Sequence, residues 1–76
     1  MRVELLTTAG CHLCEQAQQV IARAAPQAQI ELVDIGDDDA LIEQYGELIP
    51  VLRHGNAELC WPFSLLDVRG FLSDSR

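Results

Sequence analysis

The chain has 76 residues, of which 49% are hydrophobic, and a formal net charge of −7. A chain this short buries one modest core, so we expect a single domain spanning residues 1–76. The five cationic residues are all arginines scattered along the sequence, which argues against nucleic-acid binding, because that function depends on clustered cations. Apolar runs are far shorter than the roughly 20 residues of a membrane span. Residues 1–6 do not form a secretory signal, so we expect no membrane association and a cytoplasmic location.

The first half of the chain predicts a strand, a helix and a second strand. Residues 2–8 are rich in strand formers and end at Ala9-Gly10. The next apolar residues recur at helical spacing and predict a helix that ends before Pro26. Residues 29–35 predict the second strand. A strand–helix–strand unit of this length favours parallel pairing of the second strand with the first. The predicted inner face of the helix consists of Leu13, Ala17, Val20, Ile21 and Ala24.

The second half predicts a helix, a hairpin and a last helix. Three aspartates at 37–39 precede an apolar stripe of Leu41, Ile42, Tyr45 and Leu48, and they predict a helix N-terminus, with a metal or cation site as the alternative. Residues 51–54 and 57–60 predict two antiparallel strands joined by the turn at 55–56. The order βαβαββα gives an α/β fold with a four-stranded mixed sheet flanked by three helices.

The last helix is predicted from a capping box. Ser64 and Asp67 have the spacing at which a serine caps the helix and an acid three residues later bonds back to it. The predicted inner face of this helix consists of Leu65, Leu66, Val68 and Leu72.

The motif Cys11-His12-Leu13-Cys14 lies where the first strand leads into the first helix. Cys11 is therefore expected at a helix N-terminus, where partial positive charge and free N–H groups lower the pKa of a thiol below its usual value of about 8.5. We expect Cys11 to be the nucleophile in disulfide exchange and Cys14, about one turn further on, to be the resolving cysteine.

Two alternatives for the cysteine pair stay open. The pair can hold zinc or an iron–sulfur cluster, although a zinc site needs two further ligands and the sequence offers only Cys60, His12 and His54. The two thiols can also be incidental.

Three further residues each have two interpretations. His12 either tunes the pKa of the Cys11 thiol as an adjacent imidazolium or faces solvent. Cys60 is expected to be a semi-buried core thiol, with a third redox or glutathionylation site as the alternative. Glu4 is expected to be a surface carboxylate rather than a proton acceptor for Cys14. His54, beside the hairpin turn, is expected at the surface.

The segment after the last strand is apolar. Trp61 and its neighbours Pro62 and Phe63 are expected to pack the final helix onto the sheet, or Trp61 lines a substrate groove. Ser64 and the helix N-terminus that follows it can receive a carboxylate group.

The motif Cys11-His12-Leu13-Cys14, the dipeptide Ile49-Pro50 and the order of elements together resemble the glutaredoxin-like proteins of the thioredoxin superfamily. The resemblance covers essentially the whole chain, and it implies a thioredoxin-like fold and thiol–disulfide oxidoreductase activity. It also implies that Pro50 is a cis proline beside the redox cysteines and that the backbone of Ile49 pairs with an extended substrate segment. The residues alone show only that Pro50 stands at a strand start, where its missing N–H does little harm.

The sequence departs from the usual glutaredoxin pattern in its glutathione-binding features. Typical glutaredoxins have Cys-Pro-Tyr-Cys, a basic residue shortly before it and a Gly-Gly-x-Asp segment after the last strand, and none of the three is present here. We expect a disulfide-containing protein or small thiol as substrate, and glutathione or a thioredoxin-reductase-like protein as the cellular reductant. No bound cofactor is required, and the use of glutathione stays open. A redox-inactive adaptor with vestigial cysteines is the remaining alternative.

Overall fold

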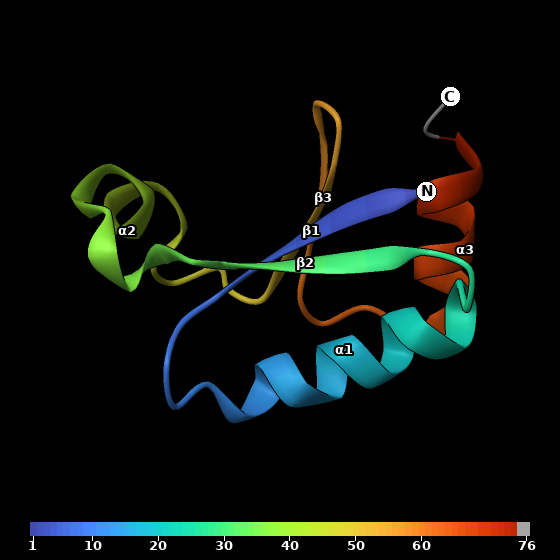
Figure 1. Ribbon diagram of the computed structural model, residues 1–76, viewed down its shortest axis with the longest axis horizontal. Helices are drawn as coiled ribbons and strands as arrows, with labels where there is room; N and C mark the ends of the chain where they lie inside the picture. Colours follow the sequence, from blue (N-terminus) through green and yellow to red (C-terminus); the bar gives the residue numbers. More distant parts are fainter. Residues whose placement is uncertain (75–76) are drawn as a thin grey trace.

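The computed structural model describes residues 1–74, and its elements follow the predicted order (Figure 1). The helices and strands are β1 (Arg2–Thr7), α1 (His12–Ala24), β2 (Gln29–Asp34), the 3₁₀ helix η1 (Ile35–Asp37), α2 (Asp39–Tyr45), β3 (Val51–His54), β4 (Ala57–Cys60) and α3 (Leu65–Asp74). The predicted thioredoxin-like α/β fold is confirmed. Among residues 1–74, no helix is long and apolar enough to cross a membrane.

The four strands form one mixed sheet in the order β2-β1-β3-β4. β1 and β2 are parallel, as predicted, with Val3 opposite Ile30, whereas β3 is antiparallel to both β1 and β4. As a result, β1, β2 and β4 all end at the edge of the sheet where β3 begins. We call this edge the exit end of the sheet.

The main core lies between the sheet and the helices α1 and α3. Alternate residues of β1, Val3 and Leu5, are fully buried on this face, because successive strand residues point to opposite faces. Figure 1 shows α1 running along this side of the sheet, with α3 beside its end. Each fully buried Leu or Ile contributes roughly 1.5–3 kcal/mol of hydrophobic stabilisation. The buried cluster consists of Val3, Leu5, Ala17, Ile21, Ala25, Leu52, Phe63, Val68 and Leu72.

The opposite face of the sheet is covered only near its exit end. A second buried cluster of Leu6, Ile35, Tyr45 and Val51 forms there, under η1 and α2. The helix α2 lies beyond the ends of the strands at the left of Figure 1.

The uncovered part of that face carries a row of charged residues. The strand register aligns Glu31, Glu4, Arg53 and Glu58 across the four strands. Arg53 Nε donates a 2.9 Å hydrogen bond to Glu4 Oε1, and the Tyr45 hydroxyl donates to Glu58 Oε2. The bond to Glu58, together with burial, raises the pKa of Tyr45 above its ordinary value. This row ties α2 to the edge strand β4.

The three aspartates at 37–39 mark a helix N-terminus, as predicted, and Asp34, the last residue of β2, caps a second one that was not predicted. The Asp38 carboxylate accepts hydrogen bonds from the N–H groups of Ala40 (3.0 Å) and Leu41 (3.2 Å) and so caps α2. Asp34 caps η1 by accepting from the N–H of Gly36 at 2.8 Å. The second strand therefore ends one residue before the predicted Ile35.

Several predicted inward-facing residues are exposed instead. Leu13 is 44% and Leu66 is 74% exposed, because each lies outside the helical arc that the buried residues of its helix share. In α3 that arc contains Val68 and Leu72, at the spacing of about one turn that places side chains on one face. Ile42 and Leu48 are also exposed, and Leu48 lies beyond the end of α2 at Tyr45.

Candidate functional site

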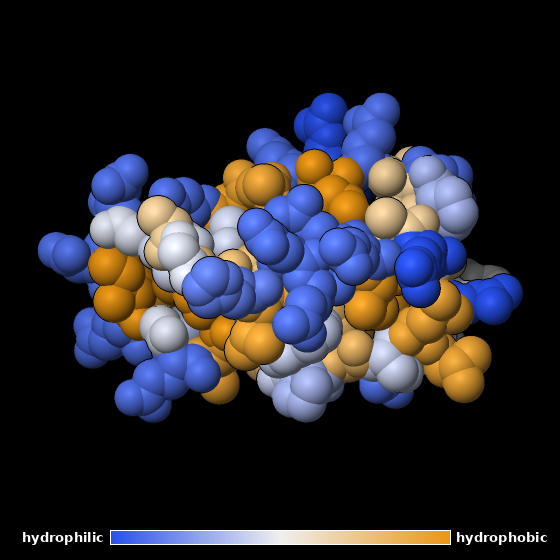
Figure 2. Space-filling model, turned by 90° about the horizontal axis from the view of Figure 1, so that it is seen from below, coloured by the Kyte–Doolittle hydropathy of each residue, from blue (hydrophilic) through white to orange (hydrophobic). Residues whose placement is uncertain are grey.

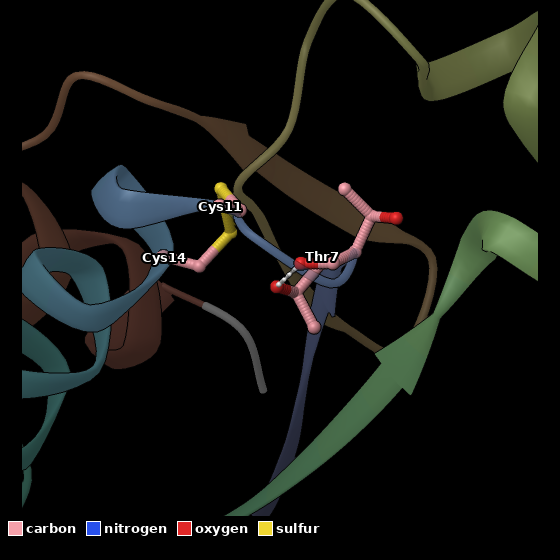
Figure 3. Close-up of a disulfide and its surroundings, with 4 residues drawn as sticks. Thr7, Cys11 and Cys14 are labelled. Atoms are coloured by element: carbon pink, nitrogen blue, oxygen red, sulfur yellow. Dashed lines mark hydrogen bonds between the residues drawn. A yellow bond between two sulfur atoms is a disulfide. The ribbon is translucent and has the colours of Figure 1, made fainter.

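Cys11 and Cys14 form a disulfide at the start of α1 (Figure 3). Their Cα atoms are 5.4 Å apart, a separation at which disulfides form readily. A three-residue offset across the first helical turn brings the two side chains together without disturbing the helix. The pair can therefore interconvert between dithiol and disulfide within this backbone.

The loop before α1 positions Cys11 at the helix N-terminus. Gly10 has a φ of +80°, a conformation that glycine adopts without steric cost, and the N–H of Cys11 donates to the carbonyl oxygen of Thr8 at 3.3 Å. Cys11 is the N-cap residue of α1, and its side chain makes no capping hydrogen bond. The first N–H groups of the helix lack partners within the helix, so they are available to a thiolate at Cys11.

The two cysteines differ in accessibility. Cys14 lies inside the first turn and is 3% exposed, whereas Cys11 is half-buried at the helix end. An external disulfide can therefore reach the sulfur of Cys11 but not that of Cys14.

Pro50 lies at the same end of the sheet as the disulfide. Val51 pairs with Leu6 near the end of β1, so the residue before Val51 lies beside the point where the chain leaves β1 for Cys11. Figure 3 shows the segment that leads into β3 passing beside Cys11. The Ile49–Pro50 peptide bond is cis, and Pro50 is fully buried.

Only part of the Ile49 backbone is free, which corrects the expectation from the sequence. Its N–H donates to the carbonyl oxygen of Tyr45 at 3.1 Å, because the chain folds back on α2 before it enters β3. Within residues 1–74, no backbone N–H donates to the carbonyl oxygen of Ile49. An extended segment can therefore pair with this residue through the carbonyl alone.

Trp61 lies next to Pro50. Its N–H donates to the carbonyl oxygen of Pro50 at 3.0 Å, and its ring meets that of Phe63 edge-on, with the centroids 4.9 Å apart. Trp61 is half-buried against the main core, which confirms the predicted packing role. The other predicted role, in a substrate groove, is compatible with its position beside Pro50.

Ser64 forms the predicted capping box at the start of α3. Its Oγ accepts from the N–H of Asp67 at 3.1 Å, and Asp67 Oδ2 accepts from the N–H of Ser64 at 2.9 Å. The N–H of Ser64 and the N–H of Asp67 are therefore occupied within the capping box and not open to an incoming carboxylate group.

The two histidines occupy different environments. His12 is exposed in the first turn of α1. His54 is half-buried rather than at the surface, because strand alternation places it on the same face as the buried Leu52. Its Nδ1 atom is buried and has no hydrogen-bond partner among residues 1–74. His54 lies at the far end of β3 from Pro50 and is not part of the site.

The expected core position of Cys60 is wrong: its thiol is exposed. Cys60 pairs with Val51 on the edge strand β4, so its side chain points to the face opposite the main core. Glu4 lies on that same face, paired with Arg53, and the sheet separates it from Cys14. Glu4 therefore cannot accept a proton from Cys14, and the preferred interpretation as a surface carboxylate holds.

No group of three or more His, Cys, Asp and Glu side chains that could hold a metal ion is found within residues 1–74.

The sequence did not point to a shallow hollow next to Ile49. Its lining residues come from α2 and the turn after it, and two of them, Ile42 and Leu48, are exposed apolar residues. Both belong to the predicted apolar stripe of residues 41–48, so no sequence pattern indicated that they face solvent. The hollow is lined by Ile42, Glu43, Gln44, Gly46, Glu47 and Leu48.

Residues 2–73 match the family described as Glutaredoxin-like domain (DUF836). Among solved structures, the chain is similar to the target protein XcR50 from X. campestris. The X-ray structure of that protein has a TM-score of 0.88 and 36% identity, covering 97% of this chain and 99% of that one. Its solution structure has a TM-score of 0.88 and 39% identity, covering 100% of this chain and 97% of that one.

A third solved structure, described as a malarial protein, shares the fold at a TM-score of 0.64 and 13% identity, over 97% of this chain and 94% of that one. A search of the curated proteins found no match.

Proposed function

Since the chain belongs to the glutaredoxin-like domain family, we propose that it is a thiol–disulfide oxidoreductase in which Cys11 is the nucleophile and Cys14 the resolving cysteine. The observation that carries the proposal is the disulfide at the start of α1, with one accessible and one buried sulfur. An asymmetric pair of this kind suits two successive exchange steps, because the substrate reaches only one sulfur and the other reacts only within the protein.

The reaction begins with the reduced pair. The Cys11 thiolate attacks one sulfur of a substrate disulfide, R–S–S–R, which forms a Cys11–S–S–R mixed disulfide and releases R–S⁻. The Cys14 thiolate then attacks the Cys11 sulfur, forming the Cys11–Cys14 disulfide and releasing the second R–S⁻. The protein loses two electrons, the substrate gains them, and the two protons of the cysteine thiols pass to the released thiolates.

The surroundings of Cys11 support this assignment. The unpaired N–H groups and the positive end of the α1 dipole stabilise a thiolate at the N-cap position. The carbonyl oxygen of Ile49 accepts a hydrogen bond from the main chain of the substrate, and the fully buried Pro50 fixes Ile49 in place. The exposed His12 imidazole adds positive charge to the same turn when it is protonated.

The substrate we propose is a protein or peptide disulfide. A cellular reductant, glutathione or a thioredoxin-reductase-like protein, regenerates the dithiol by the same steps in reverse. Glutathione is the weaker candidate, because the usual residues that bind its carboxylates are missing and no arginine among residues 1–74 lies at the exit end beside Cys11.

Mass spectrometry of single-cysteine variants tests the proposal. All proteins carry Cys60→Ser so that the exposed third thiol does not react. Reduced Cys14→Ser protein should form one equivalent of mixed disulfide on Cys11 when mixed with bis(2-hydroxyethyl) disulfide. The protein with both Cys11 and Cys14 should instead end as the internal disulfide and release two equivalents of mercaptoethanol.

The matched control is Cys11→Ser, which keeps Cys14 in place. We expect it to form the mixed disulfide much more slowly, because Cys14 is buried. Preferential capture on Cys14, or accumulation of the mixed disulfide in the protein with both cysteines, would contradict the assigned roles.

A further inference from the structure

The hollow beside Ile49 combines apolar and acidic side chains. Ile42 is 42% and Leu48 is 46% exposed, and both line the hollow together with Glu43 and Glu47. Neither carboxylate has a hydrogen bond or an ion pair among residues 1–74. Exposed aliphatic carbon next to unpaired carboxylates complements a long side chain with an apolar stem and a cationic tip.

The hollow adjoins the path that a substrate takes to Cys11. Leu48, in its lining, is followed directly by Ile49, whose free carbonyl oxygen can pair with the substrate main chain, and by Pro50. Figure 3 shows this segment beside Cys11. In an extended peptide each residue spans roughly 3.3 Å, so a substrate segment that pairs with the Ile49 carbonyl carries the residues next to its cysteine past Leu48 and the hollow.

The rest of the exit end is also acidic. Gly36 approaches Thr8 so closely that an added Cβ would lie 3.2 Å from its Oγ1, which brings η1 and its flanking acids against the loop that leads to Cys11. Glu15 lies in the first turn of α1, on the same helical face as Cys11. The acidic residues in these elements and in the hollow are Glu15, Asp34, Asp37, Asp38, Asp39, Glu43 and Glu47.

The arginines described by the structure lie elsewhere. Arg2 begins β1 and Arg23 is in the last turn of α1, both at the end of the molecule away from the disulfide. Arg53 is paired with Glu4, and Arg69 lines a hollow near the start of β1. Arg76 lies outside the described residues. The charges are therefore segregated, with acids around the redox pair and arginines away from it.

Apolar side chains are exposed among these acids. Leu13 lies within the cysteine motif at the start of α1 and is exposed. Figure 2, which views the molecule from the α1 side, shows hydrophobic atoms between hydrophilic ones at its left end, where α2 lies.

We propose that the hollow formed by Ile42, Glu43, Glu47 and Leu48 is a subsite for a lysine or arginine side chain within two residues of the substrate cysteine. The substrate class is thus a protein disulfide in a basic segment. This inference rests on the proposed function and adds the class of substrate that the oxidoreductase prefers. The aliphatic stem of the basic residue packs on Ile42 and Leu48, and its cation pairs with Glu43 and Glu47. The chemistry is unchanged: two protein thiols and one substrate disulfide become one protein disulfide and two substrate thiols.

The test uses peptides that differ in one side chain. Acetylated, amidated peptides of the form X-Ala-Cys-Ala-X are oxidised to disulfide-linked dimers, with X as Lys, norleucine or Glu. Norleucine keeps the stem of lysine and removes its charge. Reduced Cys60→Ser protein is mixed with each dimer, and the second-order rate of oxidation is measured by acid quench, alkylation and mass spectrometry. Each rate is divided by that of dithiothreitol with the same dimer, which removes intrinsic differences in reactivity.

We expect the normalised rates to fall in the order Lys, norleucine, Glu, with about tenfold or more between Lys and Glu at low ionic strength, because electrostatic attraction raises association rates. Added salt should shrink this ratio. The double variant E43Q/E47Q should lose most of the Lys preference, and Leu48→Ser should slow the Lys and norleucine peptides alike.

Glu31→Gln is the matched control. It removes an exposed carboxylate on β2, on the face away from the disulfide, and should retain the Lys preference. Equal normalised rates for the three peptides, or a Lys preference that persists in E43Q/E47Q, would overturn the subsite while leaving the proposed function intact. If no peptide oxidises the protein, the proposed function itself fails.

Discussion

The backbone N–H of Trp61 donates a hydrogen bond to the carbonyl oxygen of Pro50, 3.0 Å away. This bond continues the pairing of β3 with β4 one residue beyond Val51 and Cys60. The chain that leaves β4 is thereby fixed to the chain that enters β3, next to the redox pair. Since Trp61 also packs on the core residue Phe63, this contact anchors the segment beside Pro50 to the core.

We expect Trp61→Ala to destabilise the protein by about 2 kcal/mol, below the roughly 3–5 kcal/mol typical of a fully buried large aromatic residue, because Trp61 is half-buried. Trp61→Phe, which keeps an aromatic ring against Phe63, should lose less than half of that. Urea unfolding followed by far-ultraviolet circular dichroism measures both values. An unfolding free energy of Trp61→Ala equal to that of the unsubstituted protein would mean that the ring contact contributes nothing.

The difference in burial between the two redox cysteines predicts their order of alkylation. In the reduced protein, iodoacetamide should modify Cys11 and the exposed Cys60 well before Cys14, because Cys14 is 3% exposed. Peptide mass mapping over a time course measures the three rates. In the oxidised protein only Cys60 should react. Modification of Cys14 ahead of Cys11 would show that the assigned accessibility is wrong.

The capping box predicts a stabilising role for Ser64. Ser64→Ala removes the hydroxyl that accepts from the N–H of Asp67, and loss of such a cap costs about 1 kcal/mol. Ser73→Ala, at an exposed position in the last turn of α3, should change stability by less than about 0.5 kcal/mol. Chemical denaturation compares the two variants, and an equal effect of both would argue against the cap.

The hydrogen bond between Tyr45 and Glu58 predicts a titration that can be observed directly, because the chain has one tyrosine. The bond to Glu58, then burial and the charge of Glu58, raise the pKa of Tyr45 above 10.0. Tyrosinate absorbance should therefore develop above that pH in the folded protein, and Glu58→Gln should lower the midpoint. If the midpoint in the unsubstituted protein equals that of the unfolded chain, the bond is not formed in solution.

The same shift gives the sign of a pH effect on stability. A pKa that is higher in the folded than in the unfolded state means that the neutral hydroxyl stabilises the fold. This contribution is complete below pH 10.0, the ordinary value, and is lost as the pH rises through the folded pKa. Tyr45→Phe should flatten this alkaline decline in the unfolding free energy.

Patterns that act locally in the sequence predicted the fold well. The turn at Gly55, the capping box at Ser64 and the stop before Pro26 depend on the backbone preferences of a few neighbouring residues, and the structure has all three. The placement of Cys11 at the start of α1 also follows from one junction between a strand and a helix.

The remaining features depend on which neighbours an element packs against. Leu66 and Cys60 are apolar enough for a core, but the rotation of α3 and the register of β4 turn them outward. The Ile49 N–H is occupied because the turn after α2 folds back on Tyr45. Tertiary packing decides which of these residues come into contact. Sequence patterns therefore could not predict the hollow on α2.

A redox titration shows whether Cys11 and Cys14 work as a dithiol–disulfide couple. Cys60→Ser protein is equilibrated in buffers of varied ratio of reduced to oxidised dithiothreitol, and the fraction of internal disulfide is read by alkylation and mass spectrometry. We expect one reversible two-electron transition, in which a tenfold change in the disulfide-to-dithiol ratio corresponds to about 30 mV. A pair that shows no defined midpoint, with its oxidation state independent of the buffer, would contradict this expectation.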